Sequence, residues 1–386
     1  MINYTKHFID KKDVDSVIKS LKGQNLTQGI TVKKFEDALS KYFGSNSAVV
    51  VSNATMALYL LGIALKWKKG DHIICSPISF LSASNAALNT GAKPEFVDVD
   101  IETGNIKPKL IERKIKDLKK KNKRIKAIIV VDYGGLPADW LSLNKLAKRY
   151  KLTLINDNCH AMGARYKNDK KYACKFADYV VQSYHAAKNL TTGEGGSVIS
   201  NHKDIIDKIK ILRNHGIFKN GYSEPWMYKM KFLSYNARIT DFQCALGISQ
   251  LKKLDKVIKK KTKLANVYYN FLDRNSNLQL PEKKNDRASA YHLFPLKINF
   301  RNLKISKKKF FSLMKKKYKI NLQVHYIPIY NQPYYNKFIG VKKSNYKNSN
   351  KFYNLVLSLP IYYNMNLNLA KKVAKIINKT LIKYAK

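Results

Sequence analysis

Short apolar runs alternate with segments of helical periodicity through the first two-thirds of the chain. The runs are rich in Val, Ile and Ala, which is typical of buried strands. Strands are predicted at 48–52, 71–75, 94–99, 127–132, 153–157, 178–183 and 197–200. Helices are predicted between them, at 58–65, 81–89 and 140–150. Strands that alternate with helices predict an α/β fold with a mostly parallel sheet covered on both faces.

The pattern changes near residue 251, where a lysine-rich stretch follows that predicts one long helix at 252–272. Beyond it the pattern predicts strands and helices in turn, at 292–298, 307–318, 322–325 and 369–384, with polar loops at 273–288 and 336–350. We therefore predict two domains. Residues 1–250 form an N-terminal arm and a large α/β domain, and residues 251–386 form a smaller α+β domain.

The formal net charge is +47, from 73 Lys and Arg residues against 26 Asp and Glu residues. Such a charge is typical of proteins that bind nucleic acids. The excess is nearly all lysine, however, and it is spread along every predicted helix rather than gathered in one patch. Runs such as 119–124 are typical of solvated helix faces. We therefore predict no nucleic-acid partner, although attraction to an anionic small substrate or to membrane phosphates stays open.

The four cysteines are widely spaced and form no CxxC pair. Three of them lie in apolar strand or helix contexts, which favours buried, reduced thiols and a cytoplasmic location. The first residues carry no signal-peptide pattern, and no apolar run is long enough to span a bilayer. We expect a cytoplasmic protein without membrane insertion, and we predict no metal site.

Lys188 lies in a loop of small residues and glycines, 183–196, between two predicted strands. A lysine enclosed in a pocket can lose its proton and attack a carbonyl carbon, which is the chemistry of a Schiff base. Pyridoxal phosphate is the commonest cofactor that uses this chemistry. The alternative is a surface lysine in a flexible turn, and it would be favoured if this loop stood alone.

Pyridoxal phosphate also needs a carboxylate at its ring nitrogen, donors for its phosphate and a flat group against its ring. Asp157 ends a predicted strand and can supply the carboxylate, or it can simply cap the next helix. Thr55 and Ser183 follow strands and can bind phosphate, with the N-cap of a helix as the alternative for the segment at Thr55. Phe80 can stack on the ring, although an aromatic residue at such a place is more often core.

Several segments together resemble one family, the DegT/DnrJ/StrS sugar aminotransferases, which are pyridoxal-phosphate enzymes of fold type I. The similar segments lie in the same order along nearly the whole chain, at 52–58, 70–74, 91–98, 157–164, 183–196, 213–217, 235–243 and 325–328. Each segment alone is a weak signal, and together they are specific. The resemblance implies the fold of a large α/β domain with a small α+β domain, and a homodimer with shared active sites.

The resemblance also implies roles for individual residues. Lys188 would form the Schiff base with the cofactor, and Asp157 would pair with its ring nitrogen. The cofactor site would further include Ala54, Thr55, Phe80, His160 and Ser183, with Asn236 reaching the phosphate bound by a neighbouring subunit. His325 and Tyr326 lie on the loop that would meet the sugar nucleotide. From the residues alone, His160 and His185 are equally well explained as core histidines.

Within the family the chain looks most like the aminotransferases of pseudaminic acid synthesis, through the segments 76–80, 103–106 and 323–335. This implies transfer of an amino group from L-glutamate to C4 of a UDP-linked 4-keto-6-deoxy-N-acetylhexosamine, in ping-pong steps, for a cell-surface polysaccharide. The alternatives are a different keto-sugar nucleotide, as in perosamine synthesis, or a non-catalytic relative that only binds the cofactor. One departure from the family is the Asp132-Tyr133-Gly134-Gly135 segment, which replaces a more usual segment that contains a histidine.

Overall fold

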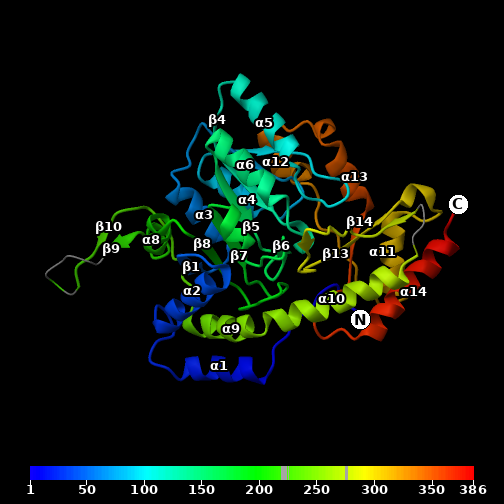
Figure 1. The fold of residues 1–386 in the computed structure, drawn as a ribbon, viewed down its shortest axis with the longest axis horizontal. Coiled ribbons are helices and arrows are strands. Elements are labelled where there is room, and N and C mark those ends of the chain that lie inside the picture. The colour runs from blue at the N-terminus through cyan, green and yellow to red at the C-terminus, as the bar shows by residue number, and fades with distance from the viewer. Residues whose placement is uncertain (219–223, 225, 274–276) are drawn as a thin grey trace.

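The computed structural model describes residues 1–218, 224, 226–273 and 277–386. Its centre is a seven-stranded sheet in the order β1-β8-β7-β5-β4-β2-β3 (Figure 1). The strands are β1 (Ser47–Val51), β2 (Asp71–Cys75), β3 (Lys93–Phe96), β4 (Arg124–Val131), β5 (Thr153–Asp157), β7 (Tyr179–Ser183) and β8 (Gly196–Ser200). Only β8 runs antiparallel to its neighbours among these strands, so the mostly parallel sheet is confirmed.

Helices cover both faces of this sheet because alternate strand residues point to opposite sides. Val50 belongs to the core on one face, together with residues of α2, α5, α6 and α7, whereas Val49 and Val51 belong to the core on the other face, together with residues of α3, α4 and α8. The helices before and within this part are α1 (Lys11–Leu21), α2 (Ile30–Phe43), α3 (Ala54–Ala64), α4 (Ser82–Asn89), α5 (Pro108–Lys120), η1 (Tyr133–Gly135), α6 (Trp140–Tyr150), α7 (Tyr172–Phe176) and α8 (Lys203–Leu212). The strands are therefore apolar throughout, as the sequence predicted.

A second sheet of three strands has the order β11-β13-β14 and a core of its own. Its strands are β11 (Leu278–Gln279), β13 (Phe294–Ile298) and β14 (Val356–Leu359). The helices of this half are α9 (Asp241–Lys252), α10 (Leu254–Phe271), η2 (Phe300–Asn302), α11 (Lys307–Lys316), η3 (Ile329–Asn331), α12 (Pro333–Ile339), η4 (Lys343–Asn345), α13 (Lys347–Leu355) and α14 (Leu367–Lys383). In Figure 1, α9 and α10 run one after the other from the first sheet to the second. The predicted boundary at residue 250 stays a prediction.

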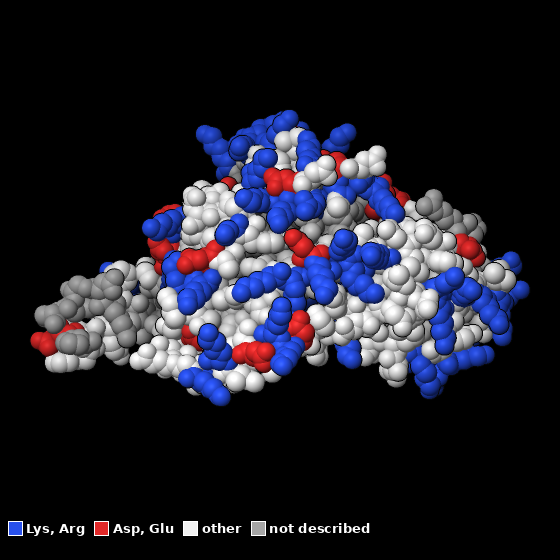
Figure 2. All heavy atoms as spheres, turned by 60° about the horizontal axis from the view of Figure 1, so that its bottom comes forward, with Lys and Arg blue, Asp and Glu red and all other residues white. Residues whose placement is uncertain are grey.

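Two short antiparallel pairs complete the described part. β6 (Arg165–Tyr166) pairs with β12 (Arg287–Ala288), and β9 (Ile217–Phe218) pairs with β10 (Lys229–Met230). The β9–β10 pair projects away from the rest of the molecule (Figure 1). Figure 2 shows Lys and Arg side chains spread over the whole visible face, with Asp and Glu between them.

Four predictions of secondary structure need correction. The helix expected at 252–272 is broken at Lys253, whose ammonium binds Asp10 and Asp13 beside α1. The strand expected at 322–325 is absent from these described residues, which hold only an isolated bridge from Gln323 to Ser358. The loop expected at 336–350 is largely helical, because Asp98 caps α13 from a distant part of the chain. The loop expected at 273–288 contains the two-residue strands β11 and β12.

Candidate active site

A cavity of about 720 Å³ lies at the carboxyl ends of the parallel strands, where open α/β sheets bind their ligands. Nine of the ten predicted site residues line it: Ala54, Thr55, Phe80, Asp157, His160, Ser183, Lys188, His325 and Tyr326. They come from the ends of four strands, β1, β2, β5 and β7, from the loop before β8 and from the segment that precedes η3. Residues that are far apart in the sequence therefore meet in one place.

Lys188 is held in the loop between β7 and β8, where its backbone N–H donates to the carbonyl of His185 at 2.9 Å. Its ammonium makes no hydrogen bond or ion pair with any residue that the structure describes. Burial lowers the pKa of Lys188, and the nearby Cys159 and Asp157 partly offset this effect. A lysine with a lowered pKa has a larger fraction of free amine, which is the form that attacks a carbonyl.

Asp157 is the last residue of β5, and its carboxylate is buried at the bottom of the cavity. Cys159 is the only described residue that donates a hydrogen bond to it, with its N–H at 3.3 Å. Burial raises the pKa of Asp157, and a hydrogen bond from Cys159 and the charge of Lys188 counteract the rise. A buried carboxylate with so few donors is suited to a cationic N–H from a ligand.

The N-terminus of α3 forms another side of the cavity. Asn53 caps this helix by accepting the N–H of Met56 at 2.8 Å. The first N–H groups of a helix have no partner within the helix, so those of Ala54 and Thr55 are available to an anion. Gly196 allows this arrangement, because a Cβ there would lie 2.4 Å from the Ala54 nitrogen. The hydroxyls of Thr55 and Ser183 line the same cavity.

Phe80 and His160 lie beside Tyr326 on the lining of the cavity. The ring centroids of Phe80 and Tyr326 are 6.3 Å apart, and His160 Nε2 lies 2.9 Å from the Tyr326 hydroxyl. The N–H of Gly134 donates to His160 Nδ1 at 3.3 Å. Nδ1 is therefore an acceptor, and the proton of the neutral ring is on Nε2, from which it is donated to Tyr326. Burial lowers the pKa of His160 well below its usual value, in agreement with a neutral ring.

His325 directly precedes Tyr326, and hydrogen bonds hold both its ring and its carbonyl. Its Nδ1 lies 2.8 Å from the Ser358 hydroxyl, and its carbonyl accepts a hydrogen bond from Tyr133. Burial and the charge of Lys188 lower the pKa of His325 to about 4, so its ring is neutral near pH 7. The predicted substrate residues His325 and Tyr326 thus lie in the cavity as uncharged side chains.

The cavity residues fit pyridoxal phosphate. Lys188 supplies an amino group without an acceptor among the described residues, Asp157 a carboxylate for a ring N–H, and the start of α3 a place for a phosphate. The rings of Phe80, His160 and Tyr326 supply flat surfaces. Among the described residues, no group of His, Cys, Asp and Glu is arranged to hold a metal ion.

Comparison with known proteins agrees with this geometry. The model of the DegT/DnrJ/EryC1/StrS aminotransferase family matches residues 7–378. The chain is a DegT/DnrJ/EryC1/StrS aminotransferase. It is 39% identical to the UDP-4-amino-4,6-dideoxy-N-acetyl-β-L-altrosamine transaminase of Campylobacter jejuni over 382 residues, which cover 99% of this chain and 96% of the relative.

Solved structures of this family have the same fold. PseC of Helicobacter pylori, an aminotransferase of pseudaminic acid biosynthesis, aligns with a TM-score of 0.86 and 32% identity over 99% of both chains. The putative sugar aminotransferase Spr1654 of Streptococcus pneumoniae aligns with a TM-score of 0.90 at 22% identity, over 99% of this chain and 100% of that one, and its structure is described as a PMP form. The predicted family, fold class and enzyme class are therefore confirmed.

Asn236 is the one predicted site residue that lies outside this cavity of the DegT-family chain. Its side chain is exposed, and its Oδ1 accepts the N–H of Arg238 at 3.2 Å. It follows the β9–β10 pair that projects from the molecule (Figure 1). A contact of Asn236 with the phosphate of a neighbouring subunit stays a prediction.

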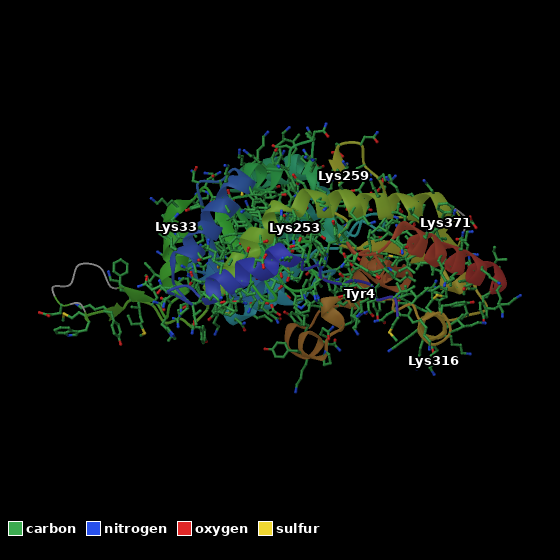
Figure 3. The ribbon with its side chains drawn as sticks, turned by 90° about the horizontal axis from the view of Figure 1, so that it is seen from below. Tyr4, Lys33, Lys253, Lys259, Lys316 and Lys371 are labelled. Atoms are coloured by element: carbon green, nitrogen blue, oxygen red, sulfur yellow. The ribbon has the colours of Figure 1, made fainter. Side chains whose placement is uncertain are left out.

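Sequence reasoning missed two residues of the DegT-family site, Tyr4 and His292, and left His185 open. Tyr4, labelled in Figure 3, lies with its ring 5.2 Å from that of His325, and its carbonyl accepts the N–H of Ile361. No local pattern marks either residue, because a terminal arm and a loop reach the cavity only through tertiary contacts. His185 lines the cavity with an exposed ring.

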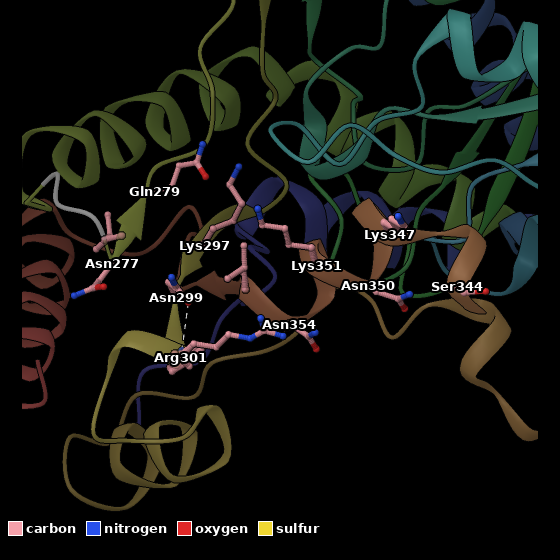
Figure 4. Close-up of a pocket in the computed structure, with 13 residues that line it drawn as sticks. Asn277, Gln279, Lys297, Asn299, Arg301, Ser344, Lys347, Asn350, Lys351 and Asn354 are labelled. Carbon is pink, nitrogen blue, oxygen red and sulfur yellow. Dashed lines mark hydrogen bonds between the residues drawn. The ribbon is translucent and has the colours of Figure 1, made fainter. Parts of the chain in front are cut away.

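A larger cavity of about 1130 Å³ lies beside the second sheet (Figure 4). Its charged lining residues are all cations, Lys297, Arg301, Lys347 and Lys351. It contains none of the predicted site residues, and three of its four cations are exposed side chains in a lysine-rich chain. Size alone therefore does not identify the active site. No helix in the described ranges is both long and apolar enough to cross a membrane.

Proposed function

We propose that this DegT-family enzyme transfers an amino group from L-glutamate to C4 of a UDP-linked 4-keto-6-deoxy-N-acetylhexosamine, with pyridoxal phosphate as cofactor. The product would be a nucleotide sugar of the pseudaminic acid type, used for a cell-surface polysaccharide. The observation that carries the proposal is Lys188, without a hydrogen-bond acceptor among the described residues and with a lowered pKa, in one cavity with the buried carboxylate of Asp157. The names of the Campylobacter relative and of PseC support the substrate class.

When bound, the cofactor would supply an electron sink for the carbanion that forms as the amino acid loses its Cα proton. Lys188 is suited to carry that proton, because burial lowers its pKa and so favours the neutral amine that acts as a general base. Asp157 would keep the ring nitrogen protonated and so stabilise the developing charge. Donor and acceptor would use the same cavity in turn, as a ping-pong reaction requires.

The phosphate would bind at the start of α3, to the N–H groups of Ala54 and Thr55 and to the hydroxyls of Thr55 and Ser183. Phe80 would stack on one face of the ring, with His160 near it. His325 and Tyr326 would contact the sugar nucleotide.

We further propose a homodimer in which Asn236 completes the phosphate site of the other subunit. The segment before Asn236 exposes large apolar side chains, among them Trp226 at 73% and Leu233 at 83% exposure. Soluble monomers rarely expose so many large apolar residues in one segment, and such patches mark interfaces. A partner subunit that covers this segment would bring Asn236 to a second cavity.

The first experiment is an absorbance spectrum of the purified protein with pyridoxal phosphate, before and after addition of L-glutamate. We expect a visible band that glutamate converts to ultraviolet absorbance, and a UDP-linked 4-keto sugar should restore the band. Other donors and keto-sugar nucleotides are tested in parallel. If glutamate leaves the band unchanged while another amino acid converts it, the proposed donor is wrong. If no keto sugar restores it, the proposed acceptor is wrong.

Lys188→Ala should give no visible band with the cofactor and no turnover. Lys203→Ala is the matched control, because Lys203 is an exposed lysine at the start of α8, outside the cavity. The control should behave as the wild type does. A Lys188→Ala variant that transfers the amino group at the wild-type rate would refute the catalytic role of this residue.

A further inference from the structure

His292 lies in the active-site cavity, yet no step above uses it. It belongs to the segment between β12 and β13, and only 5% of its surface is exposed. Its Nδ1 is buried without a hydrogen-bond partner, and neither ring nitrogen bonds to any residue of the described chain. Buried polar atoms of folded proteins nearly always have a partner. The described chain therefore leaves a hydrogen-bonding position of His292 to a group from outside it, either a water molecule or a bound ligand.

The backbone holds His292 firmly in this position. The N–H groups on either side of it, those of Ala290 and Leu293, donate to the carbonyls of Gly135 and Gly134 at 2.9 and 3.1 Å. Gly135 has a φ of +101°, and a Cβ there would lie 2.9 Å from the His160 carbonyl and 3.1 Å from the His292 nitrogen. The two glycines thus press the histidine segment against His160. These contacts fix the backbone of His292 next to that of His160.

His160 is the nearest polar ring, and it cannot serve as the partner. The ring centroids of His160 and His292 are 4.4 Å apart with planes inclined by 41°. His160 Nδ1 accepts from Gly134, and its Nε2–H donates to Tyr326, so both of its nitrogens are already in use. Lys188 and Lys261 add positive charge on the same side and disfavour a protonated ring. Burial lowers the pKa of His292 well below its usual value, so the imidazole is neutral.

We propose that His292 hydrogen-bonds the uncharged sugar ring of the nucleotide-sugar substrate and so helps to select a sugar at this position. This inference rests on the proposed function, whose nucleotide-sugar substrate it assumes. A neutral imidazole both donates and accepts a hydrogen bond, which suits a hydroxyl or an acetamide group. Glutamate presents carboxylates instead, and these are bound best by cations. His292 is therefore expected to matter for the sugar substrate and not for the amino donor.

The test measures equilibrium binding, so that it does not depend on turnover. Isothermal titration calorimetry of the cofactor-loaded protein compares UDP-N-acetylglucosamine with UDP, which has the same nucleotide without the sugar, and the effect of each variant is read as its change from wild type for each ligand. We expect wild-type protein to bind the nucleotide sugar more tightly than UDP. His292→Phe keeps a ring of similar size without a polar atom, and it should weaken binding of the nucleotide sugar about tenfold while leaving UDP unchanged.

His292→Asn retains a hydrogen-bonding group and should recover part of this loss. His202→Phe removes an exposed histidine outside the cavity and should match the wild type. The conversion of the cofactor by L-glutamate should stay within about twofold in His292→Phe, since a neutral ring gives the donor no charge partner.

Equal losses for UDP, the nucleotide sugar and the glutamate reaction would show that His292 only supports the cavity, and would overturn the inference. Unchanged affinities in His292→Phe would overturn it as well. A failure of the proposed function looks different, because wild-type protein itself would then give no band change with glutamate or pass no amino group to a keto sugar. If wild-type protein binds the nucleotide sugar no better than UDP, the sugar contact is refuted whatever the amino donor.

Discussion

Replacing Lys261 by Met should change how the stability of this protein depends on pH. Lys261 lies in α10 with only 3% of its surface exposed, and its ammonium donates to Asn189 Oδ1 at 2.8 Å. Asn189 directly follows Lys188, and its own amide donates to the carbonyls of Met162 and Ala290. Burial, followed by the charge of Lys188, lowers the pKa of Lys261 from 10.5 to about 7.

The sign follows from proton linkage. The unfolded chain keeps the ordinary lysine pKa, so between pH 7 and pH 10.5 it binds a proton that the folded protein has released. The contribution of Lys261 to the free energy of unfolding therefore rises with pH between pH 7 and pH 10.5. This contribution is lowest below pH 7, where the buried ammonium is charged. One pH unit corresponds to about 1.4 kcal/mol. Since the folded form is half titrated at pH 7, the gain from pH 7 to pH 9 is about 2 kcal/mol.

The assay is urea unfolding of the cofactor-free wild type and of Lys261→Met at pH 7 and pH 9. Subtracting the two free energies of unfolding at each pH removes the contributions of all other ionisable groups. We expect the difference, wild type minus variant, to rise by about 2 kcal/mol between the two pH values. The control is Lys259→Met, which removes an exposed lysine from the same helix (Figure 3).

For the control, the difference should be the same at both pH values. If the Lys261→Met difference is also constant, Lys261 does not titrate between pH 7 and pH 9, and its burial has been misjudged. A difference that falls as pH rises would reverse the sign of the linkage, and would mean that the folded protein stabilises the ammonium.

Three further predictions concern other parts of the molecule. Asp157→Asn should retain the cofactor but lose at least about 100-fold in transfer rate, because a neutral amide does not hold a ring proton; an unchanged rate would remove Asp157 from its role. Gly135→Ala should destabilise the protein by about 1–3 kcal/mol in urea unfolding, because φ is +101° and the Cβ would lie 2.9 Å from the His160 carbonyl; a neutral effect would contradict this close packing. Leu233→Asp should shift the protein from dimer to monomer in analytical ultracentrifugation, because it places a charge in the proposed apolar interface; an intact dimer would move the interface elsewhere.

Much of the active site was predictable, because the relevant residues follow strand ends. Asp157 and Ser183 each end a strand, and in a parallel sheet such positions meet at one edge. Lys188 was recognisable from the small residues around it. Each of these signals comes from residues that are close together in the sequence. Each predicted position is confirmed because the strands on which it depends are present in the structure.

What the sequence did not reveal depends on contacts between distant segments. His292 was assigned to the start of a strand, but β13 begins at Phe294, and the ring of His292 is placed by hydrogen bonds next to Gly134 and Gly135. The helix cap of α13 comes from Asp98, which no local pattern could indicate. Where the structure departs from local propensity, a tertiary hydrogen bond decides the conformation.

A comparison of Lys188 with two buried lysines, Lys261 and Lys297, shows why the residue type alone could not identify the catalytic group. The ammonium of Lys297 donates hydrogen bonds to three oxygen atoms, at 2.9–3.1 Å. These are the carbonyls of Ile101 and Glu102 and the Glu102 carboxylate. Lys261 has one acceptor, the side chain of Asn189, and within the described part of the chain Lys188 has none. Every acceptor holds the proton and ties the side chain to one position. Lys188 is thus the one of the three whose amine is free to form a bond, and the loop that leaves it without acceptors is what makes it suited to catalysis.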